Sequence, residues 1–162
     1  MHPVTRTNMS RRKAMVNNTI RVMVEEDKKC VMEMMKVFYA SPAVSTNGSE
    51  EIFRSDVENC VGECPYIEGY IFQEDKEVQG YAMVSKGFST EAGKVCIWIE
   101  DLYVKSEYRG LGLGGKFFDF LEKKYPDTVI KLEVDKENER AIKLYEKCGY
   151  QNLPYFVMKK LV

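Results

Sequence analysis

The sequence predicts an α/β fold in which helices and strands are mixed along the chain: a central mixed, mostly antiparallel sheet of six to seven strands, with helices on both faces. Two observations predict it. Apolar residues alternate with period two at residues 66–104 and recur at helical spacing on either side of this stretch. The second half then reads strand–helix–strand, an order that requires a parallel, right-handed crossover.

The N-terminal part predicts one strand and two helices. A short alternating strand is expected at residues 19–24, followed by a helix at residues 25–40. The apolar stripe of this helix is rich in methionine, which is more typical of core filling than of a ligand groove. After a polar loop, a second helix is expected at residues 51–61.

The middle of the chain predicts three strands joined by polar turns, at residues 66–73, 78–84 and 94–104. The third is apolar at almost every position. A strand that is apolar on both sides is covered on both faces, so the third strand is expected near the centre of the sheet.

The C-terminal part returns to helical spacing. A helix is predicted at residues 110–125, a strand at 128–134 and a helix at 139–147, with a glycine where a helix C-cap is expected. Residues 155–161 alternate again and predict a last strand.

Composition narrows the class of protein. The 162 residues carry a net charge of −1, without the basic excess of a domain that grips nucleic acid phosphates. Residues 1–18 are polar and are expected to form a disordered tail, which leaves 19–162 as a single domain. The tail lacks the apolar core of a secretory signal, and no stretch reaches membrane-spanning length, so we expect a cytoplasmic protein.

The cysteines and the histidine argue against a metal site. The five cysteines form no paired framework, although Cys60 and Cys64 are four residues apart, and the single histidine, His2, lies in the tail. A structural zinc site needs four ligands, usually in two close pairs. We therefore expect no metal and free thiols in a reducing compartment. The lack of a usable histidine also disfavours histidine-based nucleophilic mechanisms.

The most informative stretch is a glycine-rich turn between the central strand and the following helix. It reads Arg109-Gly110-Leu111-Gly112-Leu113-Gly114-Gly115-Lys116. Glycines let a backbone turn its N–H groups toward a ligand at close range, and a helix N-terminus carries partial positive charge. The turn therefore predicts a phosphate or pyrophosphate site, in preference to a merely flexible connection.

Two other phosphate-binding patterns overlap with this turn. A P-loop needs Ser or Thr after the lysine, where this chain has Phe117. The dinucleotide fingerprint is formally present, with Asp135 at a suitable distance for a ribose. However, only 27 residues follow Asp135, too few to complete a doubly wound sheet, and five residues separate the strand from the first glycine. Both patterns are disfavoured.

A third pattern fits throughout. The order Arg-x-x-Gly-x-Gly, within residues 109–114, resembles the pyrophosphate signature of the GNAT acetyltransferase superfamily. The neighbouring segments are also similar to the family: the strand Ile99-Glu100-Asp101-Leu102-Tyr103-Val104 before the turn, and Asn138, Ala141 and Tyr145 on the later helix. In order and spacing the resemblance extends over residues 19–160, and its diagnostic motifs lie within 95–150.

The resemblance implies an acetyl-CoA site. It implies a sheet splayed between its fourth and fifth strands, with the thioester in the gap. The backbone of the central strand would bind the pantetheine arm, the glycine-rich turn the pyrophosphate, and Asn138 and Ala141 would lie against the pantetheine. The implied cofactor-binding residues are Leu102, Tyr103, Val104, Arg109, Gly110, Leu111, Gly112, Leu113, Gly114, Gly115, Asn138 and Ala141.

The reaction poses two proton problems. An alkylamine arrives protonated, so a base must accept a proton before attack, and the CoA thiolate leaves better when an acid protonates it. Glu100 is the candidate base, through a water molecule, because partial burial within an apolar strand would raise its pKa. It could instead be a solvated carboxylate at the mouth of the gap. Asp101 is the alternate base, because a bulge would exchange which of the two side chains points in. Tyr145 is the candidate acid, with a packed core tyrosine as its rival.

The sequence therefore predicts an acetyl-CoA-dependent N-acetyltransferase acting on a primary amine of a small molecule, polyamine or peptide. The alternative is a non-catalytic module that binds or senses acyl-CoA. The acceptor is expected to be set by residues 30–66, which contain no motif, and the resemblance is compatible with a homodimer. The strand at 99–104 is similar to that of diamine and polyamine acetyltransferases. The acids Glu50, Glu51, Asp56 and Glu58 are a weak signal for a polycation.

Overall fold

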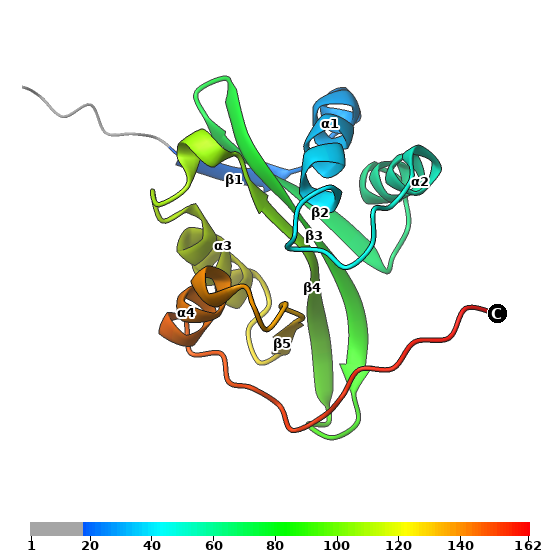
Figure 1. Ribbon diagram of the computed structural model, residues 1–162, viewed down its shortest axis with the longest axis vertical. Helices are drawn as coiled ribbons and strands as arrows, with labels where there is room; N and C mark the ends of the chain where they lie inside the picture. The colour runs from blue at the N-terminus through cyan, green and yellow to red at the C-terminus, as the bar shows by residue number, and fades with distance from the viewer. Residues whose placement is uncertain (1–17) are drawn as a thin grey trace, which may run out of the picture.

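The computed structural model describes residues 18–162 and contains one five-stranded sheet with four α-helices (Figure 1). The predicted tail lies outside these residues except for Asn18, which begins the first strand. The strands are β1 (Asn18–Val22), β2 (Ile67–Glu74), β3 (Glu77–Ser89), β4 (Lys94–Val104) and β5 (Val129–Leu132). The helices are α1 (Lys28–Tyr39), α2 (Glu50–Val61), α3 (Leu113–Lys124) and α4 (Glu139–Lys147), with 3-10 turns at Glu25–Asp27 and Ser106–Tyr108.

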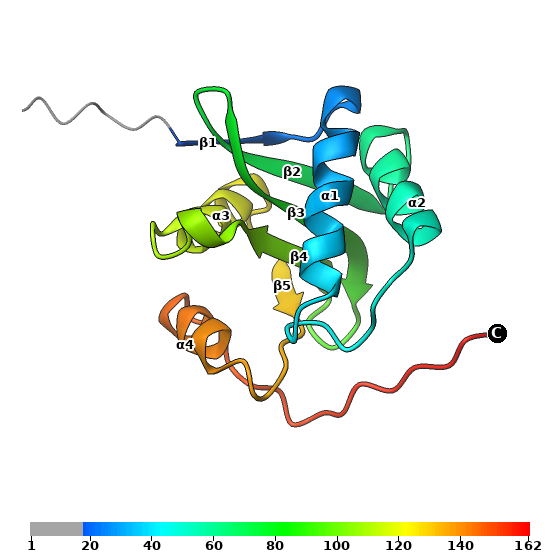
Figure 2. The same ribbon diagram turned by 45° about the horizontal axis from the view of Figure 1, so that its top comes forward.

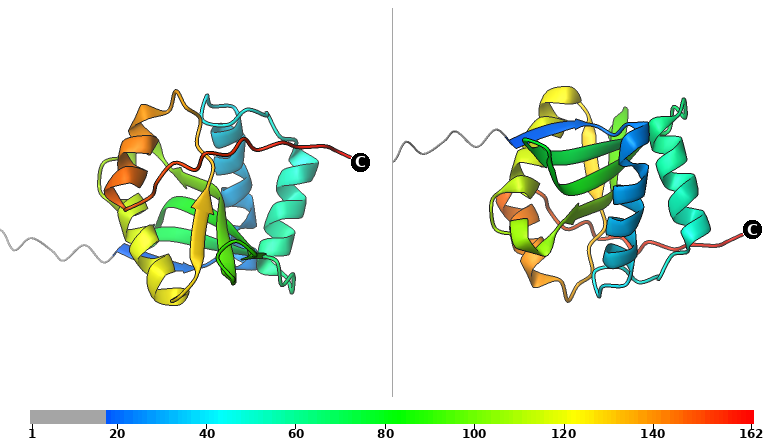
Figure 3. Two further views of the ribbon diagram at one scale, coloured as in Figure 1. Left: turned by 90° about the horizontal axis from the view of Figure 1, so that it is seen from below. Right: turned by 90° about the horizontal axis from the view of Figure 1, so that it is seen from above.

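The helices cover both faces of the sheet, as the sequence predicts. Figure 3 shows α1 and α2 on one side and α3 and α4 on the other. Successive side chains of a strand point to opposite faces, so Ile71 packs beneath α1 and α2 while Tyr70 and Phe72 pack beneath α3. Burial on both faces explains why the central strands read as nearly continuous apolar runs.

The sheet order is β1-β2-β3-β4-β5, with antiparallel pairing except between β4 and β5. The parallel pair confirms the predicted crossover through α3. It extends only over residues 96–99 of β4 and 129–132 of β5. Beyond Ile99, β4 continues to Val104 without a partner on that side, and Figure 2 shows β5 diverging from it. The sheet is therefore splayed where the resemblance implied.

The predicted strand count of six to seven is too high, because residues 155–161 form no strand. This segment crosses the end of the sheet instead of running along β5 (Figure 3), and the Tyr155 hydroxyl donates to Glu91 in the β3–β4 turn at 2.9 Å. A strand needs a neighbour along its length, and the apolar side chains of this segment remain exposed.

A partly buried carboxylate fastens the C-terminal end of α3 to the sheet. Glu68 of β2 accepts hydrogen bonds from Lys124 at 2.8 Å and from Lys86, Tyr70 and Tyr125. Burial alone would raise the pKa of Glu68, but these four donors outweigh it and lower the pKa to about 2. Because α3 begins at the glycine-rich turn, this anchor also fixes the direction of the helix that the turn opens.

Candidate active site

One extra residue in β4 determines how the two neighbouring carboxylates are placed. Met83 of β3 lies opposite Asp101, whereas Val84, the next residue, lies opposite Ile99. Glu100 is therefore the additional residue of a β-bulge, which reverses the faces that the following side chains occupy. Ile97 and Ile99 pack beneath α3, but Tyr103 packs beneath α1.

Asp101 is buried beneath α1, where only 4% of its surface is exposed. Its carboxylate accepts hydrogen bonds from Tyr39 at 3.0 Å and from Tyr81 at 2.8 Å. Burial raises the pKa of Asp101 to about 6 even though both tyrosine hydroxyls stabilise the ionised form. Asp56 of α2 is also near, and burial followed by the charge of Glu100 raises its pKa.

Glu100 has the opposite environment. It accepts a hydrogen bond from the Ser85 hydroxyl at 2.5 Å and is exposed, so the expectation that it is partly buried in the apolar strand is wrong. The bulge explains the exposure of Glu100, because it displaces this residue from the regular alternation of the strand. Asp101 is buried in its place. Glu100 nonetheless lines a large cleft on the splayed side of β4.

This cleft has a volume of about 840 Å³ and lies between the separated ends of β4 and β5. Its walls come from the last residues of β4, the glycine-rich turn, the loop after β5 and α4. Both predicted catalytic residues and nearly all predicted cofactor-binding residues line it: Glu100, Leu102, Tyr103, Val104, Arg109, Gly110, Gly112, Leu113, Gly114, Gly115, Asn138, Ala141 and Tyr145. Leu111 is the exception, since its side chain points to solvent and is 57% exposed.

The unpaired edge of β4 presents backbone groups to the cleft. The Lys105 N–H donates to Gln79 of β3 at 2.9 Å, and the Tyr103 carbonyl also lies on the β3 side, against Gly80. Alternate residues of a strand direct their backbone groups to opposite sides, so those of Leu102 and Val104 face away from β3. These groups are available to an extended, amide-containing ligand arm. The Val104 carbonyl currently accepts from Arg109 Nε at 2.9 Å.

The glycine-rich turn is open toward the cleft. Gly110 and Gly112 have φ values of +82° and +80°, a region that residues with a Cβ rarely adopt. A Cβ built on Gly110, Gly112 or Gly115 would meet nothing within 4 Å, so the backbone there can be approached closely. The first bond of α3 runs from the Lys116 N–H to the Gly112 carbonyl at 3.0 Å, which leaves the preceding helical N–H groups free for an anion.

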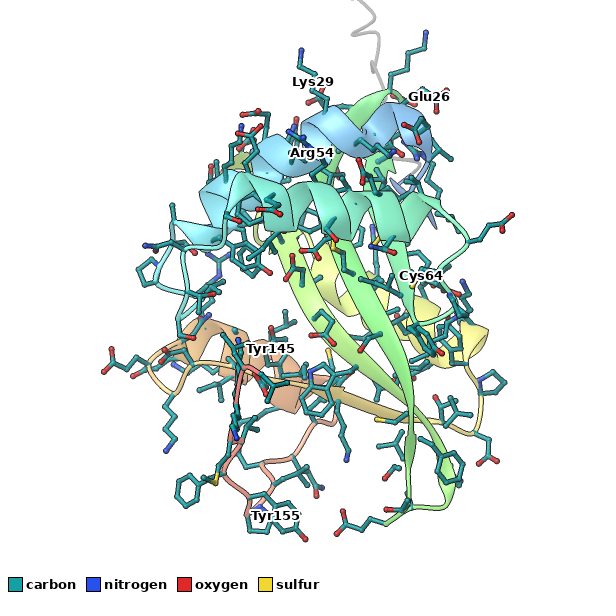
Figure 4. The ribbon with its side chains drawn as sticks, turned by 90° about the vertical axis from the view of Figure 1, so that its right-hand side faces the viewer. Glu26, Lys29, Arg54, Cys64, Tyr145 and Tyr155 are labelled. Atoms are coloured by element: carbon teal, nitrogen blue, oxygen red, sulfur yellow. The ribbon has the colours of Figure 1, made fainter. Side chains whose placement is uncertain are left out.

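The fourth wall is α4, which supplies Tyr145. Asn138 is the N-cap of this helix, where its side-chain oxygen accepts from the Ala141 N–H at 3.2 Å. Figure 4 shows Tyr145 beside α4 within the molecule, in contrast to Tyr155 at its lower margin. The Tyr145 ring meets Phe118 edge-on at 5.8 Å, and burial raises the pKa of its hydroxyl. The hydroxyl is therefore protonated at neutral pH.

Sequence reasoning missed part of this site. The loop after α1 contributes Ser41, Pro42 and Ala43 to the cleft, and Tyr39 and Tyr81 enclose Asp101. The loop falls within the expected acceptor region, residues 30–66, but it has no periodicity or motif that would identify particular residues. The two tyrosines lie on other elements, so only the tertiary structure reveals them as partners of Asp101.

The described residues were also compared with what a metal site and a membrane-spanning helix require. Among residues 18–162, no three His, Cys, Asp or Glu side chains are grouped as a metal site would need. Within the same range, no helix has the length and apolar character needed to cross a membrane.

The fold and cleft define an acyltransferase, and comparison with protein families agrees. The model of the Acetyltransferase (GNAT) family matches residues 32–150. The chain therefore belongs to this family and is an N-acetyltransferase.

Two relatives of similar sequence carry the name of one particular acetyltransferase. Thialysine N-epsilon-acetyltransferase of Sus scrofa is 32% identical over 151 residues, which cover 86% of this chain and 87% of the relative. The enzyme of the same name from Bos taurus is 35% identical over 116 residues, 65% of this chain and 66% of the relative.

Solved structures share the fold at lower identity. A possible acetyltransferase from Clostridium difficile 630 has a TM-score of 0.76 and 19% identity, covering 90% of this chain and 97% of that one. The aminoglycoside N-acetyltransferase AAC(6')-Iy, in complex with CoA, has a TM-score of 0.74 and 13% identity, covering 90% and 95%.

Proposed function

We propose that this protein transfers the acetyl group of acetyl-CoA to the primary amine of a small, lysine-like molecule, by direct attack of the amine on the thioester. The carrying observation is that Glu100 and Tyr145, from different elements, line the same cleft as the glycine-rich turn and the open edge of β4. A module that only senses acyl-CoA needs neither side chain in this cleft.

Acetyl-CoA suits the described walls. Its pyrophosphate matches the free N–H groups at the start of α3, and the approach is clear because Gly110 and Gly112 have no side chain and face open space. Its pantetheine amides match the backbone groups of Leu102 and Val104. The thioester would then lie toward Glu100 and Tyr145, where β4 and β5 have separated.

Glu100 is proposed to accept the ammonium proton of the acceptor through water. Its exposure in the cleft leaves Glu100 reachable by water and by the acceptor, whereas Asp101 is enclosed by two tyrosine hydroxyls. Asp101 and Asp56 are instead proposed to add negative potential near Glu100, which favours a cationic acceptor. In this proposal the exposed carboxylate of Glu100 accepts the proton, and the neighbouring carboxylates of Asp101 and Asp56 supply the negative potential.

Tyr145 is proposed to protonate the sulfur of the leaving CoA. The raised pKa of its hydroxyl keeps the proton available at neutral pH, and packing against Phe118 holds the ring in place. The amine attacks the carbonyl carbon, the carbon–sulfur bond breaks, and the proton from Tyr145 converts the thiolate to the thiol. The nitrogen loses a second proton as it becomes an amide, and a proton from solvent restores the Tyr145 hydroxyl.

The named relatives suggest the acceptor class. Thialysine carries a side-chain amine like that of lysine, and we propose that this chain acetylates an amine of that kind. The test measures CoA thiol release from acetyl-CoA with thialysine, lysine, diamines, polyamines, aminoglycosides and a peptide N-terminus. We expect the highest kcat/KM with thialysine or a similar small amine. Turnover confined to aminoglycosides or peptides would contradict this acceptor class, and no turnover with any amine would contradict the function.

A further inference from the structure

One face of α4 carries cationic side chains that the proposed chemistry does not use. Arg140, Leu144 and Lys147 follow each other at intervals of four and three residues, so they share a face of the helix. All three line the acetyl-CoA cleft described above, and all three also line a second, more open hollow of about 520 Å³. This face of α4 therefore connects the two hollows.

This face borders the glycine-rich turn. A Cβ built on Gly114 would lie 2.9 Å from Leu144 Cδ2, so Leu144 packs closely against the start of α3. Arg140 and Lys147 flank Leu144 on the same face, and both line the second hollow as well as the cleft onto which the turn opens. An anion in the second hollow would thus be next to one held by the turn.

The charges in the second hollow are not all engaged. Lys143 lies 3.5 Å from Glu139, with which it forms an exposed ion pair. Neither Arg140 nor Lys147 forms a salt bridge with any residue between 18 and 162. Arg140 offers a planar set of donors that suits a phosphate, and Lys147 offers a mobile point charge.

We propose that Arg140 and Lys147 bind the 3′-phosphate on the ribose of CoA, in the hollow beside α4. This inference rests on the proposed acetyl-CoA site. CoA has a pyrophosphate and a separate phosphate on the ribose; the pyrophosphate matches the backbone N–H groups of the turn, so the ribose phosphate needs another cationic partner. Arg140 and Lys147 lie within the same connected space and give the protein a means to distinguish CoA from its 3′-dephospho form.

The test compares the Kd values of CoA and 3′-dephospho-CoA by isothermal titration calorimetry. Two charge-assisted contacts at an exposed site predict that wild type binds CoA roughly tenfold more tightly. The variant Arg140→Gln/Lys147→Gln should bind both ligands with the affinity that wild type has for dephospho-CoA. The preference should also diminish as salt increases, because exposed charges are screened.

A matched control variant replaces two lysines that lie outside both hollows. Lys29→Gln/Lys123→Gln makes the same change in net charge on α1 and α3, and neither residue lines either hollow (Figure 4 shows Lys29 at the far end of the molecule from Tyr145). It should keep the tenfold preference. Equal binding of both ligands by wild type, or a preference that survives in the α4 variant, would overturn the inference while leaving the acetyl-CoA site intact. Failure of both ligands to bind wild type would instead overturn the proposed function.

Discussion

At the scale of single residues, Glu100 shows how one inserted position separates two adjacent carboxylates. The bulge leaves Glu100 exposed in the cleft and turns Asp101 beneath α1 between Tyr39 and Tyr81. The sequence identified both as candidates for the base and could not separate them, because the spacing of residues does not reveal a bulge. The register of β3 against β4 separates them.

If Glu100 relays the proton of the amine, Glu100→Gln should lower turnover by roughly 10²-fold at neutral pH. The loss should shrink as pH rises toward the amine pKa of about 10.4, because free amine then becomes abundant. The measurement is the pH–rate profile of kcat/KM, with the exposed α3 substitution Glu122→Gln as control. A Glu100→Gln profile that parallels that of the control would remove Glu100 from the mechanism.

The raised pKa of Asp101 predicts that the free energy of unfolding depends on pH. Its folded-state pKa of about 6 lies above the ordinary value of 3.8, so the folded state holds more protons than the unfolded state between these values. Its stabilising contribution is thus present below about pH 4 and is lost as pH rises through 6. The difference corresponds to roughly 3 kcal/mol at most. Urea unfolding at pH 4.5 and 7.5 should show this loss in wild type and a flatter dependence in Asp101→Asn. An equally steep dependence in the variant would contradict the assignment.

The variant Tyr145→Phe distinguishes a catalytic role of the Tyr145 hydroxyl from a packing role of its ring. Tyr145→Phe keeps the edge-on contact with Phe118, so melting temperature and acetyl-CoA affinity should stay near normal. Turnover should fall on the order of 10²-fold, as expected on losing a positioned proton donor, and should partly recover with an acyl donor whose thiol has a lower pKa. Full turnover in the variant would mean that solvent protonates the thiolate.

At the scale of elements, the periodic segments were the predictable part. The four helices and, apart from the end of β3, the five strands fall within a few residues of their predicted ranges, because each has an apolar face that must be buried. The length of β3, which continues to Ser89, and the absence of a strand at 155–161 were not predictable. Both depend on whether a neighbouring strand edge is available, which a local pattern cannot report.

The start of α3 gives an element-scale prediction. Gly112→Val places a branched side chain at φ +80°, in space where it meets no protein atom. We expect a cost of about 1–2 kcal/mol in the free energy of unfolding and loss of acetyl-CoA binding, because the side chain occupies the approach to the turn. Gly93→Val is the matched control: Gly93 has φ +64° and equally open surroundings, but lies in the β3–β4 turn. If both variants lose the ligand, or neither does, the turn is not the site.

At the scale of the whole molecule, the separation of β4 from β5 creates the space for a ligand. Glu68 binds the C-terminal end of α3 to β2, and Leu144 packs α4 against the N-terminal end of α3. The two helices that border the cleft are therefore both anchored. The sequence pointed to the parts of the cleft walls that come from the glycine-rich turn, the strand before it and α4, because these segments carry motifs. It did not predict the loop after α1, which carries none.

The central claim is that this cleft binds acetyl-CoA and not another nucleotide cofactor. The direct measurement is the melting temperature of the protein with acetyl-CoA, NAD or ATP at matched concentrations. A ligand that binds the folded state raises the melting temperature by mass action, by about 5 °C or more at 100 times its Kd. We predict such a rise with acetyl-CoA and none with NAD or ATP. A rise with NAD and none with acetyl-CoA would contradict the account.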